Sequence, residues 1–205
     1  MTDTRDPLSQ PVTRSPEVET RAMTAADVAD VSALHRRVFG PGRFARTAYR
    51  VREGASTPSP YCRIAVDGPR IVAALTMTPA RIGDRGGGLL LGPLAVDPDY
   101  ANLGYGRRLI AESLAVAGGA GVQLVVLVGD MAYYGRLDFA TIAPGRIVFP
   151  GPVDPKRLLY RELAAGAVAG YHGVIVADAA HPRSVDARQA DAGVTPDDTD
   201  APTGS

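Results

Sequence analysis

The clearest change of hydrophobic pattern lies in the middle of the chain. Residues 89–96 are almost all apolar, which is typical of a strand buried on both faces. After a short polar interruption, Gly104 and Gly106 open a segment in which apolar residues recur with the helical period instead. One face of this predicted amphipathic helix carries Leu109, Ile110, Leu114 and Ala117. The pattern therefore predicts a buried strand, a turn and a helix with a glycine-rich start.

The predicted helix start has the chemistry of an anion-binding site. The first N–H groups of a helix have no partner within it, and the helix dipole makes the local potential positive. Gly104 and Gly106 have no Cβ atoms to keep a ligand away, and Arg107 adds a positive charge in the first turn. The segment has neither the Gly-Lys-Ser/Thr of a P-loop nor the third glycine of the dinucleotide fingerprint. Taken alone, it is also compatible with an ordinary helix start.

Gly92 and Pro93 lie inside the predicted buried strand. A proline has no N–H to donate to a strand ladder and is disfavoured in central strands. Its position indicates that the strand stops pairing with a neighbour there, which leaves backbone groups for a ligand.

The segments before this strand show alternating strand and helix patterns. Residues 18–23 predict a first strand, and Thr24 and Asp27 are suited to the start of a helix. The stripe of this helix consists of Val28, Val31, Leu34, His35 and Val38, and Gly40-Pro41-Gly42 ends it. Residues 44–53 predict a second helix. Two strands, 61–66 and 71–78, are joined by a tight turn at Asp67-Gly68, and a loop is expected at 81–88.

The segments after the central helix are shorter. Residues 122–128 form a second unbroken apolar strand, and Asp130 can cap a short helix that ends near Leu137. A late strand is predicted at 147–149. Segments 158–163 and 171–176 are either a closing hairpin, which we favour, or a helix and a strand.

This order of elements predicts an α/β fold, a mixed sheet with helices on both faces. The strands at 89–96 and 122–128 flank the central helix and should therefore be parallel, joined by a right-handed crossover.

Two motifs together resemble the GNAT superfamily of acyl-CoA-dependent N-acetyltransferases. The first runs from Leu94-Ala95-Val96 through Asp97-Pro98-Asp99-Tyr100 to Asn102-Leu103-Gly104-Tyr105-Gly106-Arg107, with Ala101 where the superfamily has Gln or Arg. The second is Tyr133-Tyr134-Gly135-Arg136-Leu137-Asp138-Phe139, which is similar to Phe-Tyr-x-x-x-Gly-Phe. Asp138 stands where Gly is usual, and Asp tolerates positive φ better than most residues. The resemblance covers residues 18–149 and is more specific than either motif alone.

The resemblance implies a largely antiparallel sheet whose central parallel strands splay apart, with the CoA arm between them. It assigns acetyl-CoA binding to Leu94, Ala95, Val96, Asn102, Leu103, Gly104, Tyr105, Gly106 and Arg107. The strand would contribute mainly backbone groups, since its side chains suit a core. Other members carry Asn at the position of Leu127, so one expected cofactor contact is missing.

Tyr134 occupies the position of the superfamily's general acid, and the adjacent Tyr133 is interpreted as a packing residue. Tyr134 could also be a packing residue on a short helix. No general base is evident: Asp130 is better explained as a cap, and Glu53, His35 and His172 have no supporting pattern. The arginines of the two-helix region, on the acceptor side in GNAT proteins, could attract an acidic acceptor or form a solvated face; they are Arg36, Arg37, Arg43, Arg46, Arg50 and Arg52.

Composition restricts the remaining possibilities. The 205 residues suit one domain, for which we expect bounds of 17–178 between disordered tails at 1–16 and 179–205. A formal net charge of zero does not suggest nucleic-acid binding. A transmembrane run and a secretory signal are both lacking, and Cys62 is the only cysteine, so a cytoplasmic protein without a disulfide or a metal is expected.

The sequence thus predicts an acetyl-CoA-dependent N-acetyltransferase. Its acceptor would be a primary amine of a small molecule or peptide, which attacks the thioester directly. A homodimer is compatible with the sequence. Two alternatives stay open: a non-catalytic acyl-CoA-binding sensor or partner module, and a nucleotide-binding α/β domain.

Overall fold

The structure is a computed structural model that describes residues 18–40, 51 and 58–178. The predicted helix at 44–53, apart from Val51, and both predicted tails lie outside the described residues.

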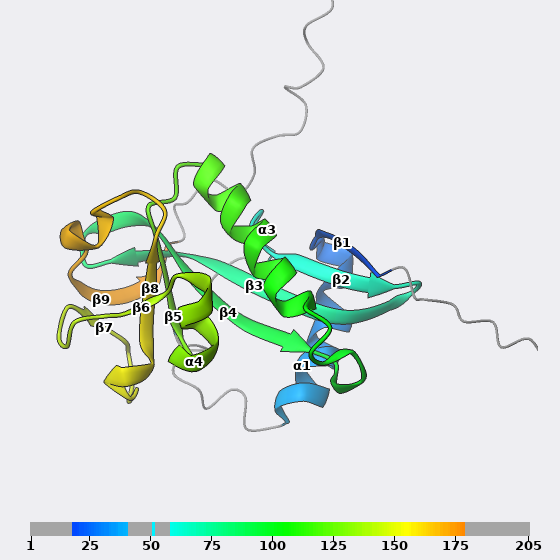
Figure 1. Cartoon of the computed structure of the whole chain (residues 1–205). Helices are drawn as coiled ribbons and strands as arrows, with labels where there is room; N and C mark the ends of the chain where they lie inside the picture. Colours follow the sequence, from blue (N-terminus) through cyan, green and yellow to red (C-terminus); the bar gives the residue numbers. More distant parts are fainter. Residues whose placement is uncertain (1–17, 41–50, 52–57, 179–205) are drawn as a thin grey trace, which may run out of the picture.

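The described chain contains a nine-stranded sheet, and its main path has the order β1-β2-β3-β4-β5-β8-β6 (Figure 1). β9 pairs with β3 and with β7. All pairs are antiparallel except β4–β5 and β7–β9, which are parallel. The strands are β1 Glu19–Ala22, β2 Arg63–Asp67, β3 Arg70–Ile82, β4 Arg85–Val96, β5 Leu124–Val128, β6 Ala140–Thr141, β7 Ile147–Val148, β8 Leu158–Glu162 and β9 Gly173–Ala177. The predicted mixed sheet is confirmed.

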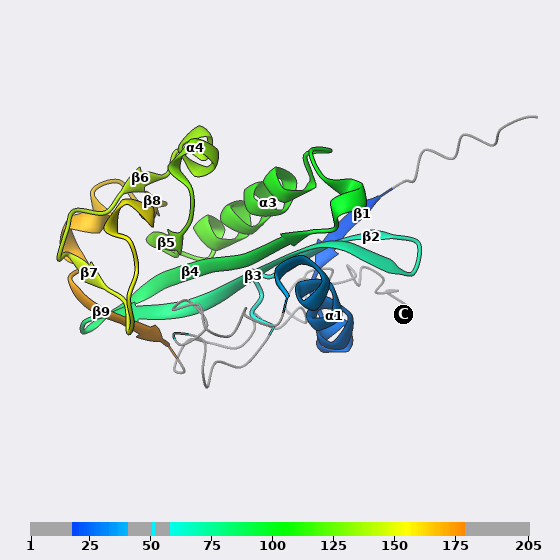
Figure 2. The same cartoon turned by 90° about the horizontal axis from the view of Figure 1, so that it is seen from below.

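Two helices cover opposite faces of this sheet, as Figure 2 shows: α3 lies on one face and α1 on the other. This arrangement confirms the predicted layers. The helices are α1 Val28–Phe39, α3 Tyr105–Gly119 and the single turn α4 Met131–Tyr134. Short 3₁₀ segments are η1 Ala25–Asp27, η3 Pro98–Tyr100, η4 Gly135–Leu137, η5 Pro155–Arg157 and η6 Ala167–Gly170.

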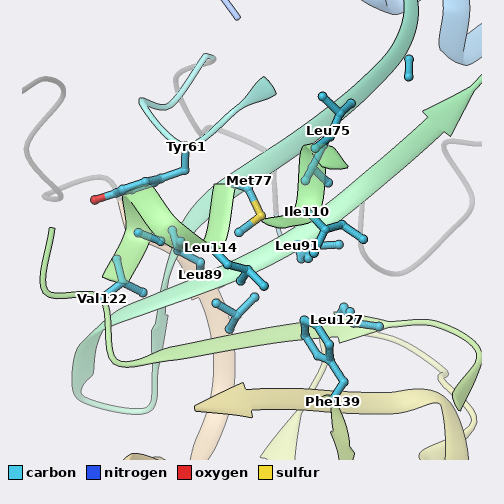
Figure 3. Packing of buried hydrophobic residues seen from close by; sticks show 14 of the residues in the cluster. Tyr61, Leu75, Met77, Leu89, Leu91, Ile110, Leu114, Val122, Leu127 and Phe139 are labelled. Atoms are coloured by element: carbon cyan, nitrogen blue, oxygen red, sulfur yellow. The ribbon is translucent and has the colours of Figure 1, made fainter. Parts of the chain in front are cut away.

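The predicted stripe of α3 is buried and forms the main core with β2, β3, β4 and β5. Leu109 and Ala117 are fully buried, and Ile110 and Leu114 contact the same cluster. Figure 3 shows Leu89 and Leu91 of β4 and Leu127 of β5 in this cluster. The core therefore joins strands on both sides of the β4–β5 boundary.

The start of α1 follows the predicted capping pattern. The Asp27 carboxylate accepts hydrogen bonds from the Thr24 N–H at 2.7 Å and from both terminal nitrogens of Arg21 at 2.7 and 2.8 Å. These hydrogen bonds, led by those from Arg21, outweigh burial and lower the pKa of Asp27. Val28, which was predicted in the apolar stripe, is instead exposed, while Val31 and Leu34 are buried.

The predicted loop at 81–88 is wrong. β3 extends to Ile82 and β4 begins at Arg85, so this segment is the end of a long hairpin. Ala80 pairs with Gly88 on one side and with Ala177 of β9 on the other. The glycine run indicated a loop, but pairing on both sides determines the backbone conformation here.

The favoured closing hairpin at 158–163 and 171–176 is also wrong. Both segments contain strands, but β8 lies between β5 and β6, whereas β9 pairs with β3 and β7. The 3₁₀ segment η6 separates them along the chain. Local apolar patterns identified the strands but contain no information about which strands they pair with.

Replacing Leu109 by Ala should lower the free energy of unfolding by about 2–5 kcal/mol, because this fully buried side chain leaves a cavity beneath α3. Val116→Ala, on the same helix but 41% exposed, should change it by less than about 0.5 kcal/mol. Urea unfolding of both variants measures the difference. Equal losses would show that α3 does not cover the core in this way.

Candidate functional site

β4 and β5 separate after a short parallel ladder. Their pairs are Gly88↔Leu124, Leu89↔Val125 and Leu90↔Val126. Beyond this point β5 continues beside β8, and β4 continues beside β3. The predicted splay of the central parallel strands is therefore present.

A bulge in β4 follows the separation directly. Gly92 and Pro93 lie opposite the single residue Thr76, because Met77 pairs with Leu91 and Leu75 with Leu94. Pairing with β5 thus already ends at Leu90, before Pro93, whereas pairing with β3 is interrupted at Gly92-Pro93 and resumes at Leu94.

The three predicted strand residues divide into two kinds. The Asp97 N–H donates to the Val72 carbonyl of β3 at 2.8 Å. Because hydrogen-bonding direction alternates along an antiparallel strand, the N–H and C=O groups of Val96 and Leu94 point away from β3. Those of Ala95 point toward β3, and its side chain is buried in the cluster beneath α1. Leu94 and Val96 therefore present backbone groups on the side that β5 has left.

The helix start lies a few residues further along. Gly104 is the N-cap of α3 with φ +88°, and a Cβ there would meet nothing within 4 Å. The first helical bond runs from the Arg108 N–H to the Gly104 carbonyl at 3.0 Å. The N–H groups of Tyr105, Gly106 and Arg107 consequently have no acceptor inside the helix. The loop before it is open, with Asn102 at φ 61° and Leu103 62% exposed.

Tyr133 of α4 reaches across to this helix start. A Cβ on Gly106 would lie 3.1 Å from the Tyr133 hydroxyl oxygen and 3.4 Å from Leu94 Cδ2. Burial raises the pKa of Tyr133, and the nearby positive charge of Arg107 partly opposes this rise. The side chain is 38% exposed. Tyr133 packs against Tyr134, as the sequence interpretation has it, and its hydroxyl also lies beside the helix start.

Tyr134 is enclosed by other aromatic rings. Its ring makes edge contacts with Tyr133 at 4.9 Å and with Phe139 at 5.6 Å between centroids. Burial raises the pKa of Tyr134 to about 12, with a further contribution from Tyr133. Its hydroxyl makes no hydrogen bond to any residue that the structure describes. The phenol therefore stays protonated and available as a donor.

The turn after Tyr134 has the predicted conformation. Asp138 adopts φ 59° and ψ 28°, the left-handed region in which glycine is usual. Arg161 of β8 donates to the Leu137 carbonyl at 2.8 Å and lies 3.5 Å from the Asp138 carboxylate. These contacts fix the segment that carries both tyrosines to the sheet.

The candidate bases from the sequence mostly have structural roles. Asp130 accepts from the Ala132 N–H at 2.9 Å and caps α4, as predicted. His35 is buried on α1 with its ring 5.8 Å from that of Phe39. His172 is exposed just before β9, and Glu53 lies outside the described residues. Within the described ranges, no group of three or more His, Cys, Asp or Glu side chains is placed to hold a metal ion.

The family model for the acetyltransferase (GNAT) domain matches residues 19–142, more than half of the chain. The chain belongs to the GNAT family. The parted strands, the open helix start and the Tyr134 segment all lie within the matched residues. As a member of this family, the chain is an N-acetyltransferase.

Individual relatives support the same assignment. The uncharacterized N-acetyltransferase YhbS of Escherichia coli K12 is 26% identical over 150 residues, which are 73% of this chain and 89% of that protein. The structure of E. coli YhbS in complex with CoA has a TM-score of 0.67 at 26% identity, covering 83% of this chain and 93% of that one. A GNAT acetyltransferase from Brucella melitensis in complex with acetyl-CoA has a TM-score of 0.53 at 25% identity, covering 74% and 98%.

No helix in the described part of this GNAT chain combines the length and the apolar character needed to cross a membrane.

Replacing Gly129 by Ala should displace the Tyr134 ring. The new Cβ would lie 2.4 Å from Cε2 of Tyr134 and 2.7 Å from Leu127 Cδ1, so the ring must move. We expect a loss of about 1–3 kcal/mol in unfolding free energy and shifted NMR signals of the Tyr134 ring.

The matched control is Gly118→Ala near the end of α3, where a Cβ meets nothing within 4 Å. It should be neutral or slightly stabilising. An unchanged Tyr134 spectrum in Gly129→Ala would contradict the packing described for this ring.

Proposed function

We propose that this protein transfers the acetyl group of acetyl-CoA to a primary amine of a small molecule or peptide by direct attack. One observation carries the proposal: Gly106 at the open start of α3 lies beside Leu94 and Val96 of β4 and beside the Tyr133 hydroxyl, and the Tyr133 ring contacts Tyr134, so these parts form one continuous region. Each alone has an ordinary structural explanation, whereas together they match the needs of an extended thioester with a diphosphate.

The residues present fit this co-substrate. Leu94 and Val96 would hold the extended arm through backbone groups, and the open N–H groups of Tyr105, Gly106 and Arg107 would hold the diphosphate. The missing Cβ of Gly104 leaves the approach to these amides clear. The complexes of E. coli YhbS with CoA and of the Brucella protein with acetyl-CoA support this assignment.

Tyr133 would add a side-chain contact to the diphosphate. Its hydroxyl lies beside Gly106, next to the open amides and near the charge of Arg107. Ala101 and Leu127 provide no polar side chain at two positions where the resemblance expects one. A phenol donor from α4 would therefore supply part of the affinity that those positions do not.

The chemical step needs little beyond positioning and hydrogen bonding. Acetyl-CoA supplies a thioester carbon. The backbone N–H of Leu94 is directed away from β3 and can donate to the carbonyl oxygen, while Tyr134 donates to the leaving sulfur. A C–N bond forms and the C–S bond breaks. One amine proton leaves nitrogen and one proton reaches sulfur, without an acylated enzyme.

The raised pKa of Tyr134 defines its part in this step. A phenol with a pKa of about 12 is a weaker acid than a thiol near 8.5, so full transfer of its own proton is uphill by about 5 kcal/mol. Tyr134 therefore acts first as a hydrogen-bond donor to the sulfur. Its proton moves only as the amine proton is released to solvent or to the phenol.

We place this reaction in the cytoplasm, in keeping with a chain whose only cysteine is Cys62. Of the arginines considered for an acidic acceptor, Arg36 donates to Ser32 and Arg37 to Asp97, and the others lie outside the described residues. Arg36 and Arg37 therefore both have partners within the protein.

Purified protein incubated with acetyl-CoA and a panel of primary amines should release free thiol with at least one of them. CoA should also raise the melting temperature, because it binds the folded state. Stabilisation by CoA without thiol release for any amine would favour the non-catalytic module. Stabilisation by ATP or NAD but not by CoA would favour a nucleotide-binding domain.

The two adjacent tyrosines should separate into two kinetic classes. Tyr134→Phe should lower kcat about a hundredfold with little change in the KM for acetyl-CoA, since the ring packing remains. Tyr133→Phe should raise that KM about tenfold and largely preserve kcat. Steady-state kinetics on both variants measure this contrast. The same change in both would contradict separate roles.

The pH profile provides a further test of Tyr134. Its phenol is the active donor while protonated, and a pKa of about 12 keeps it protonated well above the usual value of about 10. At saturating substrates, kcat should therefore show no decline attributable to this group up to about pH 10. A decline with an apparent pKa below 10 that disappears in Tyr134→Phe would overturn this assignment.

A further inference from the structure

Asp97 is the first residue after β4 and begins the loop that leads to the start of α3. It is only 3% exposed. Its carboxylate accepts from Arg70 at 2.8 Å, from Arg37 at 3.2 Å and from the Asp99 N–H at 3.3 Å. Its own N–H is bonded to Val72 of β3. Both the backbone and the side chain of Asp97 are thus fixed.

The donors come from three separate elements. Arg37 lies in the last turn of α1, Arg70 begins β3, and Asp99 belongs to η3 inside the loop itself. The guanidinium of Arg70 also lies 5.6 Å from the ring centre of Tyr100, whose hydroxyl donates to Asp67. One carboxylate therefore joins the loop to the β2–β3 hairpin and to the end of α1.

The negative charge of the Asp97 carboxylate is stabilised by its hydrogen bonds. Burial acts to raise its pKa, but the hydrogen bonds from Arg70, the Asp99 N–H and Arg37 outweigh burial, so the pKa is lowered. The ionised form accepts all three donors at once, which a neutral amide with one oxygen cannot do.

We propose that Asp97 is a positioning residue for acetyl-CoA, which acts by holding the loop 98–104 at the angle that aligns two binding surfaces. Those surfaces are the backbone edge at Leu94 and Val96 and the open amides of Tyr105, Gly106 and Arg107. They flank the loop along the chain and pack closely, since a Cβ on Gly106 would lie 3.4 Å from Leu94 Cδ2 and 3.5 Å from Val96 Cγ2, so a shift of the loop at Asp97 changes their alignment. This inference rests on the proposed function.

Because Arg37 belongs to α1, the same carboxylate links cofactor binding to that helix. CoA bound along the loop should hold Asp97, and through it the last turn of α1. Slower hydrogen exchange in residues 36–39 on addition of CoA is the expected sign of this link.

The test compares two chemically identical changes at buried carboxylates. Asp97→Asn should weaken CoA binding about tenfold by calorimetry and raise the KM for acetyl-CoA to a similar extent, with a smaller change in kcat. Asp27→Asn is the control, because Asp27 is 8% exposed, is paired with Arg21 and lies at the opposite end of α1. It should reduce stability while leaving CoA affinity unchanged.

A third variant tests the inference even if Asp97→Asn does not fold. The Arg37 side chain is half exposed, so Arg37→Gln should fold normally, lose the CoA-dependent protection of residues 36–39 and bind CoA several-fold more weakly. Wild-type affinity in both Asp97→Asn and Arg37→Gln would overturn the inference and leave the proposed function standing. Absence of CoA binding by the wild-type protein would instead overturn the proposed function.

Discussion

The early separation of β4 from β5 is the constraint on which the rest of this structure depends. Beyond Leu90, β4 has a strand neighbour within the described chain only on its β3 side. Backbone groups at Leu94 and Val96 are then left without a partner strand on that side, and a ligand can pair with them. The ligand that fits best lies extended along β4 and carries its own amides. Such a ligand would take the place of a neighbouring strand beside β4, so the site favours an extended ligand that forms hydrogen bonds.

A sheet that separates at its centre needs cohesion from elsewhere, and the core beneath α3 provides it. Leu89 and Leu91 of β4 and Leu127 of β5 contact one cluster with Phe139 (Figure 3). Leu127 stands where other GNAT members have Asn, and its side chain is only 1% exposed. Apolar packing here strengthens the contact between the two halves of the sheet, and in the proposed complex the backbone and Tyr133 would supply the polar contacts.

The sequence was informative wherever a short segment determines its own conformation. The strand and helix around Gly104, the cap at Asp130 and the left-handed turn at Asp138 follow from neighbouring residues alone. The pairing partners of β8 and β9 could not be predicted from neighbouring residues, because both strands pair with strands far away in the sequence. The ion pairs of Asp97 could not be predicted either, because Arg37 and Arg70 are 60 and 27 positions away in the sequence.

The choice between a transferase and a binding module turns on one hydroxyl group. A phenylalanine at position 134 would keep the edge contacts to Tyr133 and Phe139 without desolvating a phenol. The hydroxyl has no acceptor among the described residues, so it is available to a ligand. A thioester sulfur is a weak acceptor, whereas a leaving thiolate carries a full charge. In the proposed reaction the phenol would therefore stabilise the departing sulfur far more than the bound co-substrate, which is the difference that catalysis requires.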